Sequence, residues 1–418
     1  MNNNLNKEHK NAERRPSDID TIPEDWEVKK LGEIFDFKNG LNKEKQYFGY
    51  GTPIVNYVDV YKNRGLYSSE ILGKVDVNKQ ELKAYEVQKG DVFFTRTSET
   101  VSEIGLSTVI LDVVEQTIFS GFVLRGRPKS NDLDTLFKKY CFSSNQVRIE
   151  ITSKSSYTTR ALTNGKLLSS VQIPLPPLPE QKRIAAALSD MDSLLNNLEE
   201  LIAKKRSLKQ GVMQELLKPK KGWVVKKLGD CLLKSPDYGI NAASVPYSEN
   251  LPVYLRITDI SEDGKFVSKQ KTSVDNLNSE NYVLSNDEIV FARTGASVGK
   301  TYLYNPHDGK LIFAGFLIRV KVNTKVLDSR FLKGILETKE YWNWVTVMSM
   351  RSGQPGINGI EYSQFQFSFP PLSEQESIAK ILSEIDLEIE VLEGKRAKYQ
   401  QMKTGMMQEL LTGRVRLV

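Results

Sequence analysis

The hexapeptide pattern Pro-Pro-Leu-x-Glu-Gln occurs twice in this chain, as Pro176-Pro177-Leu178-Pro179-Glu180-Gln181 and, 194 residues later, as Pro370-Pro371-Leu372-Ser373-Glu374-Gln375. Each copy opens a segment that ends in the same pentapeptide, Met-Gln-Glu-Leu-Leu, at 213–217 and at 407–411. Two segments of equal length that begin and end alike indicate an internal duplication, in which one fold is used twice.

The duplication extends far upstream of the hexapeptides. Gly121-Phe122 and Asn164-Gly165 recur at the same offset as Gly315-Phe316 and Asn358-Gly359. Nearer the N-terminus the offset is 197, and it relates Trp26-x-Val-Lys-Lys-Leu-Gly32 to Trp223-x-Val-Lys-Lys-Leu-Gly229, and Phe94-x-Arg96-Thr97 to Phe291-x-Arg293-Thr294. The first copy therefore carries a net excess of three residues between Thr97 and Gly121.

Length and composition fit two soluble domains. The chain has 418 residues, more than one hydrophobic core usually organises, and a repeat of about 195 residues suits domains of ordinary size. Hydrophobic residues make up 39% and charged residues 26%, and no run approaches the roughly 20 apolar residues that span a bilayer. We therefore expect a cytoplasmic protein without a membrane partner.

Histidine and cysteine are too scarce and too scattered for most catalytic or metal sites. The chain has two histidines, His9 and His307, and two cysteines, Cys141 and Cys231, without ligand-type spacing. The sequence thus predicts no metal site, no disulfide framework and no enzyme of the Ser-His-Asp type. A net charge of +6 permits a polyanionic partner without identifying one.

Each copy has the pattern of an α+β domain followed by one long helix. Short β-branched and aromatic runs at 91–96, 122–125, 288–293 and 316–319 predict strands. The segments 133–149 and 327–345 predict helices, and Gly-rich polar stretches between the runs predict loops. The predicted fold class is α+β, with two related domains in tandem.

The long helices are predicted by heptad spacing. After each hexapeptide, apolar residues alternate in steps of four and three, which is typical of a coiled-coil seam. A long amphipathic helix packed on its own globular domain remains the alternative. The predicted seam consists of Ile184, Leu188, Met191, Leu195, Leu198 and Ile202 in the first copy, and Ile378, Leu382, Ile385, Ile389 and Leu392 in the second.

Connectivity limits how these helices can pair. The first helix leads from domain one to domain two and the second ends at the C-terminus, so helices paired within the chain must be antiparallel. This arrangement predicts two domains at opposite ends, related by a pseudo-twofold axis. A helix over 180–217 would be about 57 Å long, comparable to roughly 17 base pairs of DNA. Two related domains on such a spacer suit two separated half-sites on a duplex.

The order of these parts resembles the specificity subunit of type I restriction-modification systems. The resemblance covers nearly the whole chain from Trp26, and its most specific marks are the two hexapeptides, the Trp-x-Val-Lys-Lys-Leu-Gly openings and the segment Ala292–Lys300. It implies two target-recognition domains, each reading one half of a bipartite asymmetric DNA target, with the paired helices as a ruler. The first copy departs from the family pattern after Thr97, where Ser98-Glu99-Thr100 follows.

The resemblance also implies partners and a division of the chain. The helices would dock two methyltransferase subunits and, through them, restriction subunits, and the isolated chain would be able to self-associate. S-adenosylmethionine, and ATP with Mg, would be bound by those partners, so that this chain would bind double-stranded DNA without a cofactor, a metal or catalytic residues of its own. The expected parts are a polar N-terminal tail at 1–20, target-recognition domains at 21–175 and 221–370, and spacer helices at 176–220 and 371–418.

Enzyme alternatives fail on spacing and context. The segment Gly295–Thr301 is similar to a phosphate-binding loop, but it has three residues between the glycines where that loop needs four. Residues 301–304 predict a strand and Asn305-Pro306 a turn, in place of the helix that would hold a phosphate. The Pro-Pro pairs follow Leu175 and Phe369, unlike the Asn/Asp-Pro-Pro-aromatic motif of amino-group methyltransferases. A non-enzymatic scaffold that uses its helices only for assembly remains the alternative function.

Comparison of the copies separates residues that position DNA from residues that read it. Side chains identical in both copies cannot make the domains read different sequences, so they are assigned to phosphate contacts or loop scaffolding. These candidates, with the loop residue Lys300 added, are Lys29, Lys30, Arg96, Thr97, Lys226, Lys227, Arg293, Thr294 and Lys300. For the two lysine pairs, side chains that are merely solvated are the alternative to phosphate contacts.

Base contacts are expected where the copies differ, in 38–50 and 238–247, 98–102 and 296–300, and 153–160 and 349–354. For each residue in these segments, an ordinary solvated loop residue is the alternative. The base-reading candidates are Lys38, Asn39, Arg160, Arg351 and Gln354, because several of them carry side chains that suit guanine or adenine edges.

Overall fold

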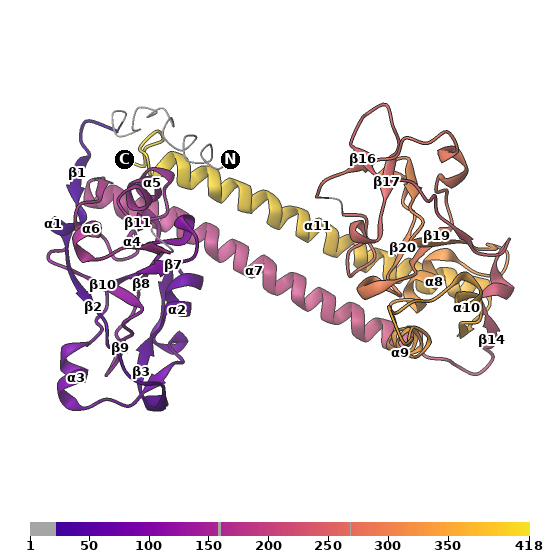
Figure 1. Ribbon diagram of the computed structural model, residues 1–418, viewed down its shortest axis with the longest axis horizontal. Helices are drawn as coiled ribbons and strands as arrows, with labels where there is room; N and C mark the ends of the chain where they lie inside the picture. Colours follow the sequence, from indigo (N-terminus) through magenta and orange to yellow (C-terminus); the bar gives the residue numbers. More distant parts are fainter. Residues whose placement is uncertain (1–21, 158–159, 268) are drawn as a thin grey trace, which may run out of the picture. The chain divides into compact units, whose positions relative to one another are not determined.

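The computed structural model describes residues 22–157, 160–267 and 269–418 (Figure 1). The polar tail predicted at 1–20 lies outside the described residues. Internal contacts divide the chain into two compact units: unit 1 comprises the residues up to Leu198 together with Lys395–Val418, and unit 2 comprises Glu199–Gly394. Each unit thus contains part of each long helix. No helix in the described ranges is long and apolar enough to cross a membrane.

A five-stranded sheet forms the centre of unit 1. Neighbouring strands are antiparallel, except that β4 is parallel to β8. On the central strand of this sheet, Val92 and Phe94 face one hydrophobic core and Phe93 faces another, because successive side chains of a strand point to opposite faces. The strands predicted at 91–96 and 122–125 are confirmed. The order is β2 (Phe35–Asn39), β10 (Val123–Pro128), β6 (Val92–Thr95), β8 (Ser107–Ile110) and β4 (Gly65–Leu66).

Unit 2 has a four-stranded counterpart. All neighbours in this sheet are antiparallel. Phe291 belongs to one hydrophobic core and Val290 to another, so this sheet is also covered on both faces. The strands predicted at 288–293 and 316–319 are confirmed. The order is β15 (Asp237–Tyr238), β22 (Leu317–Lys321), β19 (Glu288–Ala292) and β20 (Thr301–Leu303).

Smaller sheets and short helices complete both units. In unit 1 the sheets are β5–β3–β9 (Lys74–Val75, Phe48–Val55, Ile118–Phe119), β11–β12–β7 (Ser156–Tyr157, Ala161–Leu162, Thr97–Ser98) and β1–β13 (Glu27–Lys30, Gln172–Leu175). In unit 2 they are β16–β18–β17–β21 (Val245–Pro246, Thr272–Ser273, Val253–Leu255, Leu311–Phe313) and β14–β23 (Val224–Lys227, Gln366–Phe369). The short α-helices are α1 (Leu31–Ile34), α2 (Tyr57–Lys62), α3 (Lys79–Ala84), α4 (Lys138–Cys141), α5 (Asn145–Ser153), α6 (Gly165–Ser169), α8 (Ser329–Ile335), α9 (Lys339–Met348) and α10 (Gly359–Ser363).

The helices predicted at 133–149 and 327–345 are each two helices, so the prediction of single helices was wrong. In unit 1 the break between α4 and α5 falls at Ser144, whose extended backbone and side chain cap α5. In unit 2 the break between α8 and α9 falls at the equivalent Thr338, which caps α9 in the same way. A hydroxyl that accepts a hydrogen bond from a free amide favours a new helix start over a continuous helix.

The repeated opening motif forms an edge strand and a tight contact. β1 pairs with β13 in unit 1, and β14 pairs with β23 in unit 2, in both cases antiparallel. A Cβ atom at Gly32 would lie 2.8 Å from Cβ of Ser169, and one at Gly229 would lie 3.1 Å from Cβ of Ser363. The glycine is repeated because the short helix before β13 or β23 approaches the backbone at this point.

The glutamine of each hexapeptide fastens a long helix to its domain. The carbonyl of the Gln181 side chain accepts a hydrogen bond from the Asp134 amide at 2.8 Å. Its amide donates to the carbonyls of Asp132 and Pro176, both at 2.9 Å. Gln375 repeats all three bonds in unit 2, with Asp328, Val326 and Pro370. Both side chains are buried, so each helix start is fixed to the segment that leaves the central sheet.

The two long helices are α7 (Leu178–Leu216) and α11 (Leu372–Leu410), which confirms the helices predicted over 180–217 and 375–411. Within unit 1, Asp192 of α7 forms an ion pair with Lys403 of α11. Within unit 2, Lys205 and Lys209 of α7 pair with Glu388 and Asp386 of α11 at 2.5 and 2.8 Å. In unit 2 the residue numbers rise along one helix as they fall along the other, so the two segments run in opposite directions there.

The residues of the predicted seam are all buried or half-buried. In unit 1, Ile184 and Leu188 belong to the core of the domain that precedes their helix, together with Leu410 from α11. In unit 2, Ile378 and Leu382 likewise belong to the core of their own domain, together with Met213 from α7. The first turns of each helix therefore pack into the core of their own domain, as the alternative for these helices supposed, and residues from the end of the other helix belong to the same core.

Candidate nucleic-acid interface

In unit 1, several segments identified from the sequence meet at one edge of the central sheet. Because β10 is antiparallel to β2 and β6, its N-terminal end lies beside the C-terminal ends of both neighbours. The register sets the last residue of β2 against Leu124 and the last residue of β6 against Val123. This edge, here called the converging edge, carries Lys38 and Asn39 at the end of β2, Arg96 after β6 and Phe122 before β10.

Unit 2 has the same converging edge. The last residue of β15 pairs with Ile318, and the last residue of β19 pairs with Leu317. The edge therefore brings together Tyr238 at the end of β15, Arg293 after β19 and Phe316 before β22. Side chains far apart in the sequence are placed equivalently in both units, because the two sheets share strand order and direction.

The repeated arginines hold this edge together while their charges remain without a carboxylate. The guanidinium of Arg96 donates a hydrogen bond to the Gly121 carbonyl at 2.8 Å. The backbone amide of Arg293 donates to the Phe316 carbonyl at 3.1 Å, and its guanidinium lies 4.8 Å from the centre of the Tyr238 ring. Within the described residues, neither arginine forms an ion pair, so each converging edge carries an arginine whose charge no carboxylate compensates. This arrangement suits both scaffolding and attraction of a phosphate.

The reading segment predicted at 153–160 lies beside the converging edge of unit 1. β11 in this segment pairs with β12, and β12 pairs with β7, which directly follows Arg96. Arg160 is exposed, and its guanidinium lies 3.9 Å from the carboxylate of Glu99, which is also exposed. Residues 158 and 159 of this segment lie outside the described residues. Lys38 is exposed at the end of β2, where its amine donates to the Ala84 carbonyl and lies 5.3 Å from the Tyr85 ring.

The segment predicted at 349–354 occupies the equivalent place in unit 2. The Gly295 amide donates to the Pro355 carbonyl at 3.0 Å, which holds the loop against the residues after Arg293. The guanidinium of Arg351 bonds both carboxylate oxygens of Glu361, at 2.6 and 2.7 Å. Burial raises the pKa of Glu361, but hydrogen bonds from the Asn358 amide and from Arg351 outweigh it and keep this pKa below its usual value. Arg351 would have to leave Glu361 to reach a base, whereas Gln354 is exposed and makes no side-chain hydrogen bond to any described residue.

The repeated lysine pairs lie away from the converging edges. Lys29 forms ion pairs with Glu27 at 2.9 Å and with Asp132 at 3.6 Å, and Asp132 lies beyond the C-terminal end of β10. The hydrogen bond to Glu27 raises the pKa of Lys29. The remaining lysines of these pairs, Lys30 on β1 and Lys226 and Lys227 on β14, lie on strands that pair with β13 and β23, outside the two central sheets. Lys300 does lie near a converging edge, where its amine pairs with Glu262 at 2.6 Å.

Two features of the converging edge were not identified as site residues from the sequence. Gly40-Leu41-Asn42 and Gly239-Ile240-Asn241 are equivalent, at an offset of 199, and added Cβ atoms at the two glycines would lie 2.2 and 2.1 Å from the Ser120 and Ala314 carbonyls. The match would have been found in the sequence if a further change of offset between the two copies had been allowed. The second feature is exposure of Phe122 and Phe316, which the strand pattern gave no reason to expect.

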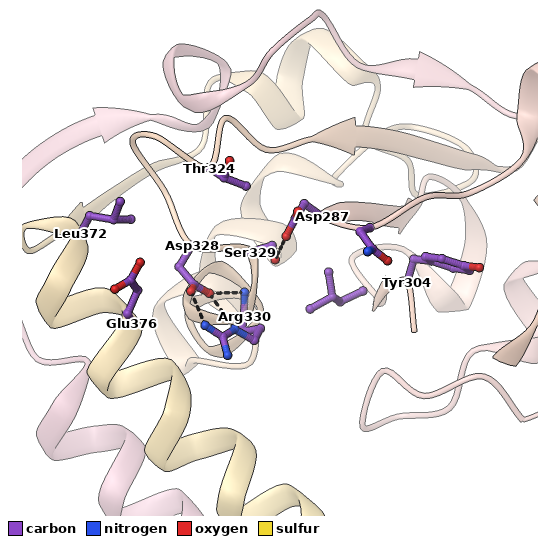
Figure 2. Close-up of a pocket in the computed structure, with 10 residues that line it drawn as sticks. Asp287, Tyr304, Thr324, Asp328, Ser329, Arg330, Leu372 and Glu376 are labelled. Atoms are coloured by element: carbon purple, nitrogen blue, oxygen red, sulfur yellow. Dashed lines mark hydrogen bonds and ion pairs between the residues drawn. The ribbon is translucent and has the colours of Figure 1, made fainter. Parts of the chain in front are cut away.

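A polar pocket of unit 2 lies at the other end of the central sheet (Figure 2). Asp328 and Arg330 form an ion pair at 2.6 Å within it, and Asp287 accepts a hydrogen bond from the Ser329 hydroxyl. Asp328 also caps α8, so its carboxylate serves the fold. No group of three or more His, Cys, Asp or Glu residues that could hold a metal ion occurs among the residues described. The strand predicted after the Gly295–Lys300 segment is confirmed as β20, which removes the helix that a phosphate-binding loop requires.

Comparison with known proteins gives one consistent family. The type I restriction modification DNA specificity domain matches twice, at residues 23–210 and 220–400. The putative type I restriction enzyme MjaX specificity subunit of Methanocaldococcus jannaschii is 25% identical over 442 residues, covering 98% of each chain. The StySPI specificity subunit of Salmonella potsdam is 24% identical over 240 residues, covering 51% of this chain and 50% of the other.

Solved structures share the fold. The S subunit of a type I restriction-modification system from M. genitalium superposes with a TM-score of 0.58 at 15% identity, covering 93% of this chain and 96% of the other. A chain from a structural study of complex assembly and conformational transition of the type I system gives a TM-score of 0.53 at 18% identity, covering 94% and 99%.

Proposed function

We propose that this chain, which belongs to the family of type I restriction-modification DNA specificity subunits, reads a bipartite asymmetric DNA target with one half-site per unit. Recognition of DNA sequence is the family's role. The division into half-sites is supported by the duplicated converging edge, which repeats its arginine and glycine framework in both units while its flanking loops differ. A common framework gives both units the same way of holding a duplex, and different loops give each its own sequence preference.

The long helices are proposed to act as a ruler and as the docking surface for two methyltransferase subunits, through which restriction subunits join. We propose that α7 and α11 pair along their heptad seams as an antiparallel coiled coil, and that a pseudo-twofold axis relates the two halves of the chain. A second apolar stripe on α7 supports docking, because Leu194, Leu201 and Leu208 recur every seven residues and are 37%, 40% and 51% exposed. Helical surfaces with such a stripe bind partner helices. In the isolated chain the same stripe would favour self-association.

Catalysis is proposed to belong to the partner subunits. S-adenosylmethionine, and ATP with Mg, would be bound there, and this chain would supply double-stranded DNA recognition alone. The candidate interface supports this assignment, because the side chains assigned to DNA contacts there are lysines, arginines, threonines, amides and aromatic rings that bind nucleic acid without performing chemistry.

Exchange of the first target-recognition domain tests independent readout. Replacing residues 26–170 with the corresponding domain of another family member should change one half-site of the methylated target and preserve the other. Sequencing of methylated adenines in the host genome, before and after the exchange, measures both half-sites at once. A simultaneous change of both half-sites would contradict readout by separate units.

A scaffold without sequence readout is the alternative function. It predicts that a complex with altered loops at 153–160 and 349–354 binds DNA as the unaltered complex does. Sequence-specific readout predicts that the same complex loses its preferred target while its methyltransferase subunits remain bound. Filter binding with matched and mismatched duplexes separates the two.

Arg293 and Arg351 should affect DNA binding in different ways. Arg293→Ala should weaken binding to all duplexes. If Arg293 touches a phosphate, the salt slope, which is the slope of the logarithm of the binding constant against the logarithm of salt concentration, should fall by about one counterion. Arg351→Ala or Gln354→Ala should relax preference at one base pair, with roughly 1–3 kcal/mol less discrimination for each bidentate hydrogen-bonded pair removed. Binding of target and single-mismatch duplexes to the assembled complex, over a range of salt, provides the measurement. The opposite pattern would reverse the two assignments.

A further inference from the structure

Phe122 and Phe316 form a repeated feature that the proposed function leaves unexplained. The two residues are equivalent in the repeat and directly precede β10 and β22. Their exposed fractions are 66% and 61%. A single exposed apolar residue is ordinary on a protein surface. Two phenylalanines that stay exposed at the same position of both copies indicate a shared role outside the hydrophobic core.

The backbone around each phenylalanine is fixed by hydrogen bonds. In unit 1 the Gly121 amide donates to the Leu41 carbonyl at 2.7 Å, and the Gly121 carbonyl accepts from Arg96. In unit 2 the Gly315 amide donates to the Ile240 carbonyl at 2.9 Å. The residue before each ring is therefore tied to a neighbouring segment of the sheet. A ring on a fixed backbone loses little conformational entropy when a partner covers it.

The surroundings of the two rings indicate what covers them. Each ring stands at a converging edge, next to an arginine that has no carboxylate partner among the described residues. The loops predicted to read bases flank the same edge in both units. The carboxylates that face the flanking loops, Glu99, Glu262 and Glu361, each lie within ion-pair distance of a cation. An exposed ring beside an arginine without a carboxylate partner suits a polyanion with an apolar interior, which is the chemistry of a DNA duplex.

We propose that Phe122 and Phe316 each press an aromatic ring against the DNA duplex and make an apolar contact that does not depend on base identity. This inference rests on the proposed function and extends it. A ring common to both units cannot account for two different half-sites, so it adds affinity and fixes the position of each unit on the duplex. Apolar side chains that wedge into base steps serve this purpose in other DNA-binding proteins.

The test uses the full chain assembled with its methyltransferase partners. The two probes are a duplex that carries the motif methylated in the host genome and a duplex of unrelated sequence. Phe122→Ala and Phe316→Ala should each weaken binding to both duplexes about tenfold, as expected for removal of one aromatic ring from the interface. The salt slope should not change, because no cation is removed. The double variant should show roughly the product of the two factors, and Phe122→Trp, which keeps a ring, should bind as the unaltered complex does.

Val113→Ala is the matched control. Val113 is 72% exposed and lies beyond the C-terminal end of β8, at the edge of the sheet opposite the converging edge. This variant should bind both duplexes with unchanged affinity. Thermal unfolding of all variants should match that of the unaltered chain, since each side chain replaced is largely exposed.

Three results would overturn the inference. Unchanged binding by the Phe122→Ala and Phe316→Ala variants would rule out the contact while leaving the proposed function intact. An effect restricted to one base pair of the methylated motif would make the ring a reader of sequence. Dissociation of the methyltransferase subunits from the complex would assign the rings to assembly. Failure of the unaltered complex to prefer the methylated motif would instead overturn the proposed function, and this inference with it.

Discussion

Gln181→Leu is expected to lower the free energy of unfolding of unit 1 by about 3 kcal/mol, because three backbone groups, one buried and two part-buried, lose the hydrogen bond to this buried side chain. The Gln181 side chain is 1% exposed and bonds the Asp134 amide and the carbonyls of Asp132 and Pro176. Leucine has a similar volume but no polar atom. Chemical denaturation of the full chain measures the decrease, and hydrogen exchange at residues 132–134 assigns it to unit 1.

The hexapeptide repeat provides a matched variant and a control for this experiment. Gln375→Leu should have the same effect in unit 2, because Gln375 makes the same three bonds. Gln214→Leu changes an exposed glutamine of α7 and should alter the free energy of unfolding by less than about 0.5 kcal/mol. Equal stability of the Gln181→Leu and Gln214→Leu variants would show that the hexapeptide does not fasten the helix.

Asp192→Ala is expected to destabilise unit 1 by about 3 kcal/mol, because it leaves two cations close together without their anion. Asp192 accepts a hydrogen bond from the Tyr140 hydroxyl at 2.7 Å, and it pairs with Lys139 at 2.7 Å and with Lys403. The side chains of Asp192, Lys139 and Lys403 are 17%, 21% and 13% exposed, so water replaces little of the missing interaction. Asp190→Ala, at a neighbouring position of α7, should be nearly neutral, because Asp190 forms no ion pair with any described residue.

The acid dependence of stability provides a second measurement at Asp192. Burial raises the pKa of this carboxyl, but hydrogen bonds from Lys139, Lys403 and Tyr140 outweigh it and hold the pKa below its usual value. A carboxyl with a lowered folded-state pKa contributes its full stability above the unfolded pKa of about 3.9 and loses it as pH falls through the folded value. Urea unfolding at a series of pH values below about 5 should show this loss in the unaltered chain and a smaller loss in Asp192→Ala. If the free energy of unfolding falls equally steeply with pH in both chains, the Asp192 carboxylate is not the source of the acid sensitivity.

Much of the local structure follows from the sequence alone. The runs at 91–96 and 288–293 form strands because their β-branched and aromatic residues alternate between two cores. The long helices are predictable because their apolar residues recur in steps of three and four, which places them on one face of a helix. The helices at 133–149 and 327–345 were joined wrongly, because a hydroxyl in a helical pattern becomes a cap only where the chain has to turn onto its neighbours.

The candidate site was predictable only in part. Arg96 and Arg293 were found because the copies repeat them, and the structure places both at a converging edge. The lysine pairs are repeated as well, yet Lys29 lies at the opposite end of β10 from Phe122, where it pairs with carboxylates. Repetition in a sequence identifies residues that both copies need, but strand register decides which of them share a surface. The exposure of Phe122 and Phe316 could not be predicted from the sequence either. Both residues stand just before a strand, and a strand pattern does not show at which residue the covered part of a sheet ends.

The sequence by itself determined the duplication, the type of each main element and the departure of the Gly295–Thr301 segment from a phosphate-binding loop. It also contains, at an offset of 194, Lys139 with Lys333, Asp192 with Asp386, and Lys209 with Lys403.

Only the tertiary structure decided how these six charges combine. Asp192 pairs with Lys139 from its own copy and with Lys403 from the other, and Asp386 pairs in the same way with Lys333 and Lys209. The physical reason is the opposite direction of the paired helix segments, which places the end of one helix beside the beginning of the other. Each charge cluster is therefore completed by a residue about 200 positions away in the chain, at a distance that no local sequence pattern records.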